Sequence, residues 1–131
     1  MGVSTSVVDH AAVYQCMRSH HLNAQQARAL TAAGAPPALV IVVTPSCPAC
    51  IWVMETLETM CAAPATGRVA AALKRMYTVD VATAATLWPR LNVERVPRAI
   101  LLRKGAATLL EDMPLLTEAD VRRLAQRAFG S

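Results

Sequence analysis

From residue 38 to residue 61, hydrophobic residues follow two different patterns. Residues 38–44 form a continuous apolar run rich in β-branched side chains, which is typical of a central strand buried on both faces. Directly after this run, apolar residues recur at spacings of three and four, which predicts a helix with one buried face. The members of that face are Cys50, Met54, Leu57 and Cys61.

A second strand and a short helix are predicted next. The helical pattern resumes over residues 68–74 after a break that contains Pro and Gly. Residues 76–81 have the composition of a strand, and either Asp80 or Thr83 can cap a short helix behind it. Trp88, followed by proline, is predicted to mark the end of that helix.

A hairpin and a last helix complete the series. Residues 99–103 and 106–110 flank a Lys-Gly pair, which predicts two antiparallel strands joined by a tight turn. Thr117, followed three residues later by Asp120, is typical of a helix N-terminus. From residue 38 onward the predicted order is β-α-β-α-β-β-α, an α/β fold.

Residues 1–37 differ from the rest because their pattern is helical throughout. A first helix is predicted to end near residues 20–21, and Asn23 can cap a second helix that continues to Ala33. We therefore expect an N-terminal helical extension, and a separate domain over residues 38–131.

Composition narrows the class of protein. The chain has 131 residues, of which 54% are hydrophobic and 17% charged, enough for one domain with a real core. The 13 basic residues against 9 acidic ones are scattered, and aromatic residues are few, so we expect no nucleic-acid partner.

No apolar run approaches the ~20 residues of a membrane helix, so we expect no membrane partner. The first ten residues lack the layout of a secretory signal, which predicts a cytoplasmic protein.

The most reactive motif is Cys47-Pro48-Ala49-Cys50, at the junction of the predicted strand and helix. Proline is favoured in the first turn of a helix because its missing N–H is not needed there. The unpaired N–H groups at a helix N-terminus favour an anion, so the first sulfur is expected to be a reactive thiolate. A CxxC pair in this position indicates thiol–disulfide chemistry.

Together these segments resemble the thioredoxin-like superfamily over roughly residues 38–129. The resemblance rests on the strand before the CxxC pair, on the strand that ends in Val79-Asp80-Val81, and on a third segment. That segment runs from Leu91 to Gly105, with Val96-Pro97 about fifty residues after the CxxC pair. The resemblance implies a central mixed four-stranded sheet flanked by helices.

The resemblance also implies the roles of individual residues. Pro97 is expected to be cis and to lie against the CxxC pair, and the backbone of Val96 is expected to pair with an extended substrate. Arg95 and Arg98 are expected beside this surface, together with Pro48, as substrate-binding residues. Cys47 is the expected nucleophile that attacks a substrate disulfide, and Cys50 resolves the mixed disulfide.

The implied activity is therefore that of a thiol–disulfide oxidoreductase. Its partners would be protein disulfide substrates and a thiol reductant, with no cofactor and no metal. The N-terminal helices offer a surface for a partner or for a second copy of the chain. Because Ala49 carries neither charge nor hydrogen-bonding group, we expect a reducing or intermediate potential rather than that of a strong oxidant.

The sequence departs from thioredoxin itself at two positions. The buried acid that thioredoxin carries six residues before the first cysteine is replaced by Ile41, and the aromatic residue directly before that cysteine is replaced by Ser46. Proton transfer to the second sulfur must therefore run through water, through another group or through the substrate.

Two other classes of function remain open. One is a non-catalytic adaptor or assembly protein with the same fold. The other is a zinc- or iron–sulfur-binding module, in which Cys16 and His20 of the extension would join Cys47 and Cys50.

Two further side chains are assigned to packing. Cys61 lies about 16 Å beyond Cys50 along a helix at ~1.5 Å per residue, so these two sulfurs cannot pair. We predict a buried free cysteine at position 61. Trp52 lies off the buried stripe of its helix and is predicted to pack beneath the N-terminal helices.

Overall fold

A mixed sheet of five strands organises the computed structural model, which describes residues 16–63, 67–110 and 117–130. The strand order is β1-β3-β2-β4-β5. The strands are β1 (His21–Leu22), β2 (Ala38–Val43), β3 (Met76–Asp80), β4 (Arg98–Arg103) and β5 (Ala106–Leu109). The helices are η1 (Arg18–His20), α3 (Ala24–Leu30), α4 (Pro48–Ala62), α5 (Gly67–Leu73), α6 (Val81–Leu87), η2 (Pro89–Leu91) and α7 (Glu118–Phe129).

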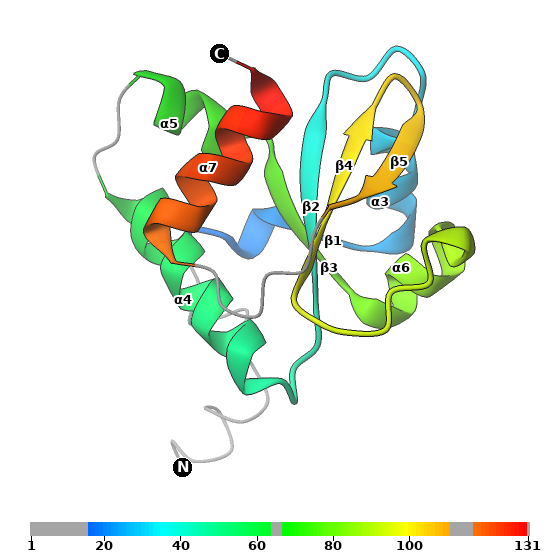
Figure 1. Ribbon diagram of the computed structural model, residues 1–131, viewed down its shortest axis with the longest axis horizontal. Coiled ribbons are helices and arrows are strands. Elements are labelled where there is room, and N and C mark those ends of the chain that lie inside the picture. The colour runs from blue at the N-terminus through cyan, green and yellow to red at the C-terminus, as the bar shows by residue number, and fades with distance from the viewer. Residues whose placement is uncertain (1–15, 64–66, 111–116, 131) are drawn as a thin grey trace.

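Helices cover both faces of this sheet. Figure 1 shows α4, α5 and α7 on one side of the strands and α3 and α6 on the other. β2 is parallel to β3 and antiparallel to β4, and β4 pairs with β5 as a hairpin. The predicted series from residue 38 onward is confirmed, as is the thioredoxin-like α/β architecture that the resemblance implied.

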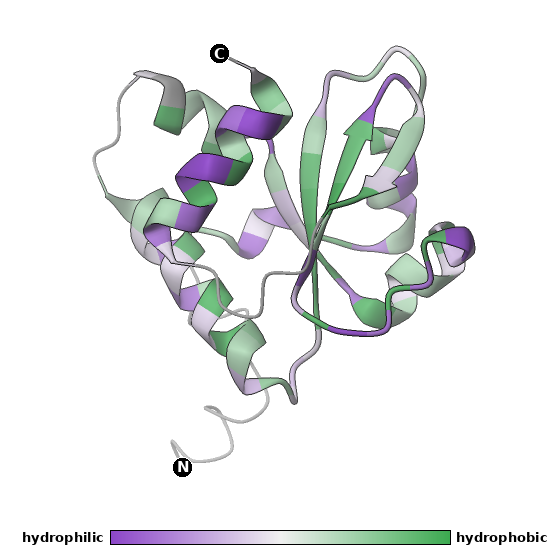
Figure 2. Cartoon of the chain, in the orientation of Figure 1, coloured by the Kyte–Doolittle hydropathy of each residue, from purple (hydrophilic) through white to green (hydrophobic). Residues whose placement is uncertain are grey.

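β2 supplies the centre of the core. All six of its residues are buried, and the green of its ribbon in Figure 2 reflects this apolar run. Alternate side chains of a strand point to opposite faces. Leu39, Ile41 and Val43 accordingly belong to the hydrophobic cluster that includes residues of α4 and α7, whereas Val40 and Val42 belong to the cluster on the α3 and α6 face.

The fifth strand comes from the N-terminal segment. His21 and Leu22 form β1, which pairs in parallel with Thr78 and Val79 of β3. The four predicted strands are present, but the sequence pattern did not predict this additional strand, because two residues are too short for a detectable alternation. The predicted first helix falls mostly on residues 1–15, outside the described residues; residues 18–20 form one 3-10 turn.

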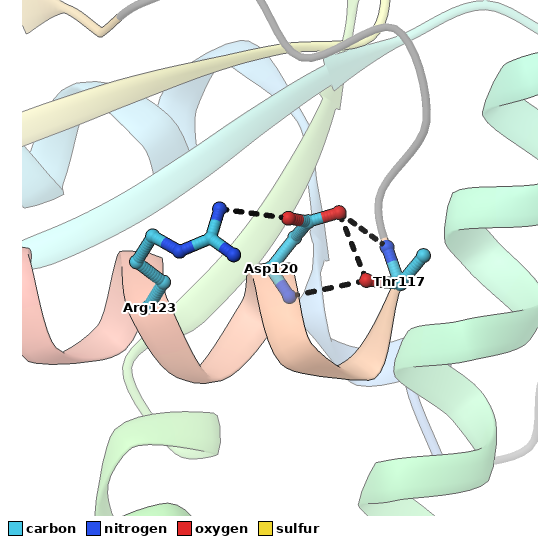
Figure 3. A network of polar contacts seen from close by, with 3 residues as sticks. All are labelled: Thr117, Asp120 and Arg123. Carbon is cyan, nitrogen blue, oxygen red and sulfur yellow. Dashed lines mark hydrogen bonds and ion pairs between the residues drawn. The ribbon is translucent and has the colours of Figure 1, made fainter.

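The ends of the helices follow the predicted capping residues. Asn23 caps α3 through a reciprocal pair of bonds with Gln26, and Asp80 caps α6 through the N–H of Ala82. In α7, Thr117 Oγ1 accepts a bond from the N–H of Asp120 at 3.2 Å, and an Asp120 carboxylate oxygen accepts from the N–H of Thr117 at 3.0 Å (Figure 3).

Trp52 lies on the surface instead of packing beneath the N-terminal segment. Its side chain on α4 is 54% exposed, so the packing prediction is wrong. The face of α4 that packs against the core comprises Cys50, Val53, Leu57 and Met60, and Trp52 lies outside it. In residues 16–63, 67–110 and 117–130, no helix is long and apolar enough to cross a membrane.

Candidate functional site

The CxxC pair lies where the carboxyl end of β2 turns into α4. Cys47 is the N-cap residue of α4, and Pro48 occupies its first turn as predicted. The Sγ atom of Cys47 accepts a hydrogen bond from the backbone N–H of Cys50 at 3.0 Å. This bond satisfies one of the N–H groups that the first turn of a helix leaves free, and it places that N–H against the first sulfur.

The two cysteines of the motif have different environments. Both are free thiols, but Cys47 is partly exposed, whereas Cys50 is 1% exposed and packs in the core. Burial raises the pKa of Cys50 to about 12, and the hydrogen bond with the Cys47 side chain acts in the same direction. A backbone hydrogen bond from Thr44 acts in the opposite direction. The exposed sulfur is therefore open to a substrate, and the buried one is held as a thiol.

The Val96-Pro97 peptide bond is cis, which confirms that prediction. Pro97 is buried, and the carbonyl oxygen of Val96 lies 3.8 Å from the Sγ atom of Cys47, within reach of a weak S–H···O contact. The segment before β4 thus lies directly beside the exposed sulfur, although the two residues are far apart in the sequence.

The arginines near this segment differ in their surroundings. Arg95 is exposed, and Arg98 is half-buried at the start of β4. The Arg98 guanidinium donates to the carbonyl oxygen of Leu110, just after β5. Because side chains alternate along β4, Arg98 lies on the same strand face as Ile100, whose cluster is the one on the α3 and α6 side. Cys47 packs against the opposite cluster.

A cavity of about 130 Å³ lies beside Cys50, which forms part of its wall. Its walls come from the N-terminal segment, from the end of β2 with the turn behind it, from α4 and from Asp80 at the end of β3. Most of the wall is apolar, with Met17, Ile51 and Met54 among its members. The charged or titratable groups that line it besides Cys50 are Arg18, His21 and Asp80.

His21 is anchored at this cavity by the additional strand. Its Nδ1 atom lies 2.8 Å from the hydroxyl oxygen of Thr78, its partner in the β1–β3 register, and Thr78 is fully buried. Desolvation lowers the pKa of His21 below its ordinary value of 6.5, and the charge of Asp80 opposes this shift. Sequence reasoning missed this histidine because no motif marks it.

The N-terminal segment is fastened to α4 by a disulfide. Cys16 and Cys61 are bonded, with their Cα atoms 5.9 Å apart and 45 residues between them in sequence. The prediction of a free buried cysteine at position 61 is therefore wrong. Glu58, one turn before Cys61, accepts hydrogen bonds from the backbone N–H groups of Cys16 and Met17 at 2.9 Å each.

The disulfide also removes the four-residue zinc set considered from the sequence. Cys16 has no thiolate to offer, and the Nδ1 atom of His20 lies 2.8 Å from the carbonyl oxygen of Met76. Within the part of the chain that the structure describes, no cluster of three or more Cys, His, Asp or Glu side chains is placed to hold a metal ion.

Comparison with known proteins gives matches in structure alone. No family model matches the sequence, and no curated protein matches it. The J-Trx1 fragment of ERdj5 matches with a TM-score of 0.59 at 16% identity, over 82% of this chain and 49% of that one. The chain therefore spans about half the length of that fragment. Trxlp from Edwardsiella tarda EIB202 matches with a TM-score of 0.54 at 20% identity, over 82% and 96% of the two chains.

Proposed function

We propose that this chain, which has the thioredoxin-like fold, is a thiol–disulfide oxidoreductase that acts on protein disulfides through Cys47 and Cys50. One observation carries the proposal: a partly exposed sulfur at a helix N-terminus accepts the N–H of Cys50, and the second sulfur is buried directly behind it. Attack and resolution need this division between an accessible and a protected thiol.

The reaction begins at Cys47. Its thiolate attacks one sulfur of a substrate disulfide, forms a mixed disulfide and releases the other substrate sulfur as a thiolate. Cys50 then loses its proton and attacks the Sγ atom of Cys47, which releases the second substrate thiolate and leaves a Cys47–Cys50 disulfide. The substrate has gained two electrons, and an external thiol reductant restores the dithiol.

Substrate recognition is assigned to the surface around Cys47. The backbone of Val96, next to the exposed sulfur, suits main-chain pairing with an extended peptide. Pro97 forms the floor of this surface; Pro48 is exposed within the CxxC motif, and Arg95 is exposed directly before Val96 in sequence. Arg98, which bonds the carbonyl of Leu110, would act by holding the end of β5 in place.

The Cys16–Cys61 disulfide bears on the compartment. Disulfides persist in oxidising environments and are rare in the cytosol. We therefore assign the protein to an oxidising compartment, although the layout of its first ten residues predicted the cytoplasm. Mass analysis of the protein alkylated at lysis would test this assignment, because a cytosolic protein would carry four alkylated cysteines after reduction in the cell.

A non-catalytic adaptor is the second candidate, and the exposure of Trp52 favours it. Its indole lies on α4, one turn beyond Pro48, where a partner approaching the motif would contact it. Hot spots of protein interfaces are enriched in tryptophan.

Turnover of a disulfide-bonded peptide by single-cysteine variants separates the two candidates. Cys47→Ser should abolish reduction, and Cys50→Ser should accumulate a mixed disulfide on Cys47 that mass spectrometry detects. Ser46→Ala, which changes an exposed neighbour of the motif, is the control and should retain turnover. Full cellular function in Cys47→Ser would instead support the adaptor.

A further inference from the structure

The resolving step demands a proton acceptor that the strand beneath Cys50 does not provide. Cys50 must become a thiolate to attack Cys47, yet it is 1% exposed and its environment favours the thiol. Ile41 of β2 is buried and apolar, so it cannot take the proton. Among residues 16–63, 67–110 and 117–130, the charged or titratable groups that line the cavity with Cys50 are Arg18, His21 and Asp80.

His21 has the chemistry of an acceptor at neutral pH. An imidazole whose pKa is lowered by desolvation is neutral there and can bind a proton. In the tautomer whose Nδ1–H donates to the hydroxyl oxygen of Thr78, Nε2 keeps a free lone pair, and His21 lines the cavity together with Cys50. The buried Thr78 and the β1–β3 pairing hold the ring in place.

The neighbouring charges act on the imidazolium that would form. The negative charge of Asp80 raises the pKa of His21 and would stabilise the imidazolium, and Arg18 is the other charged residue that lines the cavity. Asp80 itself accepts the N–H of Ala82 as the cap of α6. His20, next in sequence, is directed elsewhere, since it bonds the Met76 carbonyl and stacks on Tyr77.

We propose that His21 is the proton-transfer residue of the resolving step and that the cavity beside Cys50 is its path. This inference rests on the proposed function. A cavity of about 130 Å³ has room for water, and Arg18, His21 and Asp80 in its otherwise apolar wall offer polar partners for a water relay. Cys50 gives its proton through the cavity to Nε2 of His21, and its thiolate forms a bond to the Sγ atom of Cys47. The bond from Cys47 to the substrate sulfur breaks, the substrate thiolate departs with the electron pair, and the imidazolium then returns its proton to solvent.

This assignment gives the N-terminal segment a catalytic purpose. The Cys16–Cys61 disulfide and the two bonds to Glu58 fix the chain immediately before Arg18. Met17 is fully buried in the core and forms part of the cavity wall. The same anchorage therefore supplies one wall of the cavity and positions His21.

The two phases of reaction with 5,5′-dithiobis(2-nitrobenzoate) separate attack from resolution. Cys47 takes up one nitrothiobenzoate and releases one, and Cys50 then expels the second. His21→Gln keeps an amide that can bond Thr78 but has no basic nitrogen. We expect the first release to be unchanged and the second to slow by about 10²-fold, the lower end of general-base effects. His20→Gln is the matched control and should retain both rates.

Three further readouts distinguish proton transfer from a structural role. In His21→Ala, added imidazole should accelerate the second release and leave the first unchanged. In the wild-type protein the second release should rise with pH below 6.5 and then level off, because the pKa of His21 lies under that value. In His21→Gln this rise should be absent.

Equal rates of the second release in wild-type protein and His21→Gln would overturn the proposal. A parallel loss of both releases in His21→Gln would also overturn it. So would a failure of imidazole to accelerate the second release of folded His21→Ala. Wild-type protein that released no first nitrothiobenzoate would instead refute the proposed function, and this inference with it. The wild-type pH profile also tests the proposal if a variant does not fold.

Discussion

Cys16 is bonded to Cys61, and the bond fastens the N-terminal segment to the last turn of α4. It joins residues 45 positions apart, so it closes a large loop in the unfolded chain. That loop contains β1, α3, β2 and most of α4. The bond therefore constrains the part of the chain that carries both the CxxC motif and His21.

We predict that Cys16→Ser combined with Cys61→Ser lowers the free energy of unfolding by about 4 kcal/mol, the chain-entropy value for a loop of this length. Urea titrations of the oxidised wild type and the double variant would measure the difference. Cys47→Ser is the control, because Cys47 is a free thiol, and its midpoint should change much less. Equal stabilities of the wild type and the double variant would contradict the prediction.

Alkylation should distinguish Cys47 from Cys50 over a wide pH range. Burial raises the pKa of Cys50 from 9.0 to about 12, so its reactive thiolate stays scarce up to pH 9. Iodoacetamide should therefore modify Cys47 and spare Cys50 in the folded, reduced protein, as peptide mass analysis would reveal. In urea, Cys47 and Cys50 should react at similar rates. Preferential modification of Cys50 in the folded protein would refute the predicted protection of Cys50.

The raised pKa of Cys50 also makes the free energy of unfolding of the reduced protein depend on pH. A thiol with a raised pKa in the folded state contributes stability that is complete below pH 9 and is lost as the pH rises towards 12. The stability advantage of reduced wild-type protein over Cys50→Ala should therefore shrink across that interval, as urea titrations at each pH would record.

The sequence predicted those features that depend on neighbouring residues. The apolar run of β2, the Pro48 that opens α4 and the Thr117–Asp120 cap each act within one or two turns of chain. The cis Val96-Pro97 bond followed from resemblance to a family, and the structure has it.

Features that join distant segments could not be predicted in this way. The Cys16–Cys61 bond and the pairing of His21 with Thr78 depend on where the N-terminal segment lies on the finished fold. Trp52 shows the same limit, because helical spacing placed it off the buried stripe without revealing that its side chain is 54% exposed.

The cap of α7 should lose its effect in acid. Thr117 holds the pKa of Asp120 below its usual value through hydrogen bonds to the carboxylate, and Arg123 adds an attraction (Figure 3). Such a carboxylate contributes stability above its unfolded pKa of 3.8, and this is lost as the pH falls through its folded value.

We therefore expect Thr117→Ala to lower the free energy of unfolding by about 1 kcal/mol at neutral pH, and by less in acid. Thermal unfolding at a series of pH values would measure both. Arg122→Ala breaks only an exposed pair with Glu118 and should cost a few tenths of a kcal/mol or less. A cost for Thr117→Ala that did not decline below pH 3.8 would contradict the role of the carboxylate.

Truncation to alanine should destabilise the protein much more at Met17 than at Trp52, although tryptophan is the larger side chain. Met17 is fully buried in the main core, and Trp52 is 54% exposed. Replacing a buried methionine by alanine costs about 2–5 kcal/mol, because apolar burial is lost and a cavity remains. Surface substitutions usually change stability by about 0.5 kcal/mol or less.

Met17→Ala should therefore lower the urea midpoint strongly, whereas Trp52→Ala should leave it nearly unchanged. Because Met17 also lines the cavity beside Cys50, Met17→Ala should in addition alter the rate of the second nitrothiobenzoate release. Trp52 is not among the residues that line this cavity, so Trp52→Ala should not alter that rate. A large loss of stability in Trp52→Ala would mean that its indole packs more deeply than its exposure indicates.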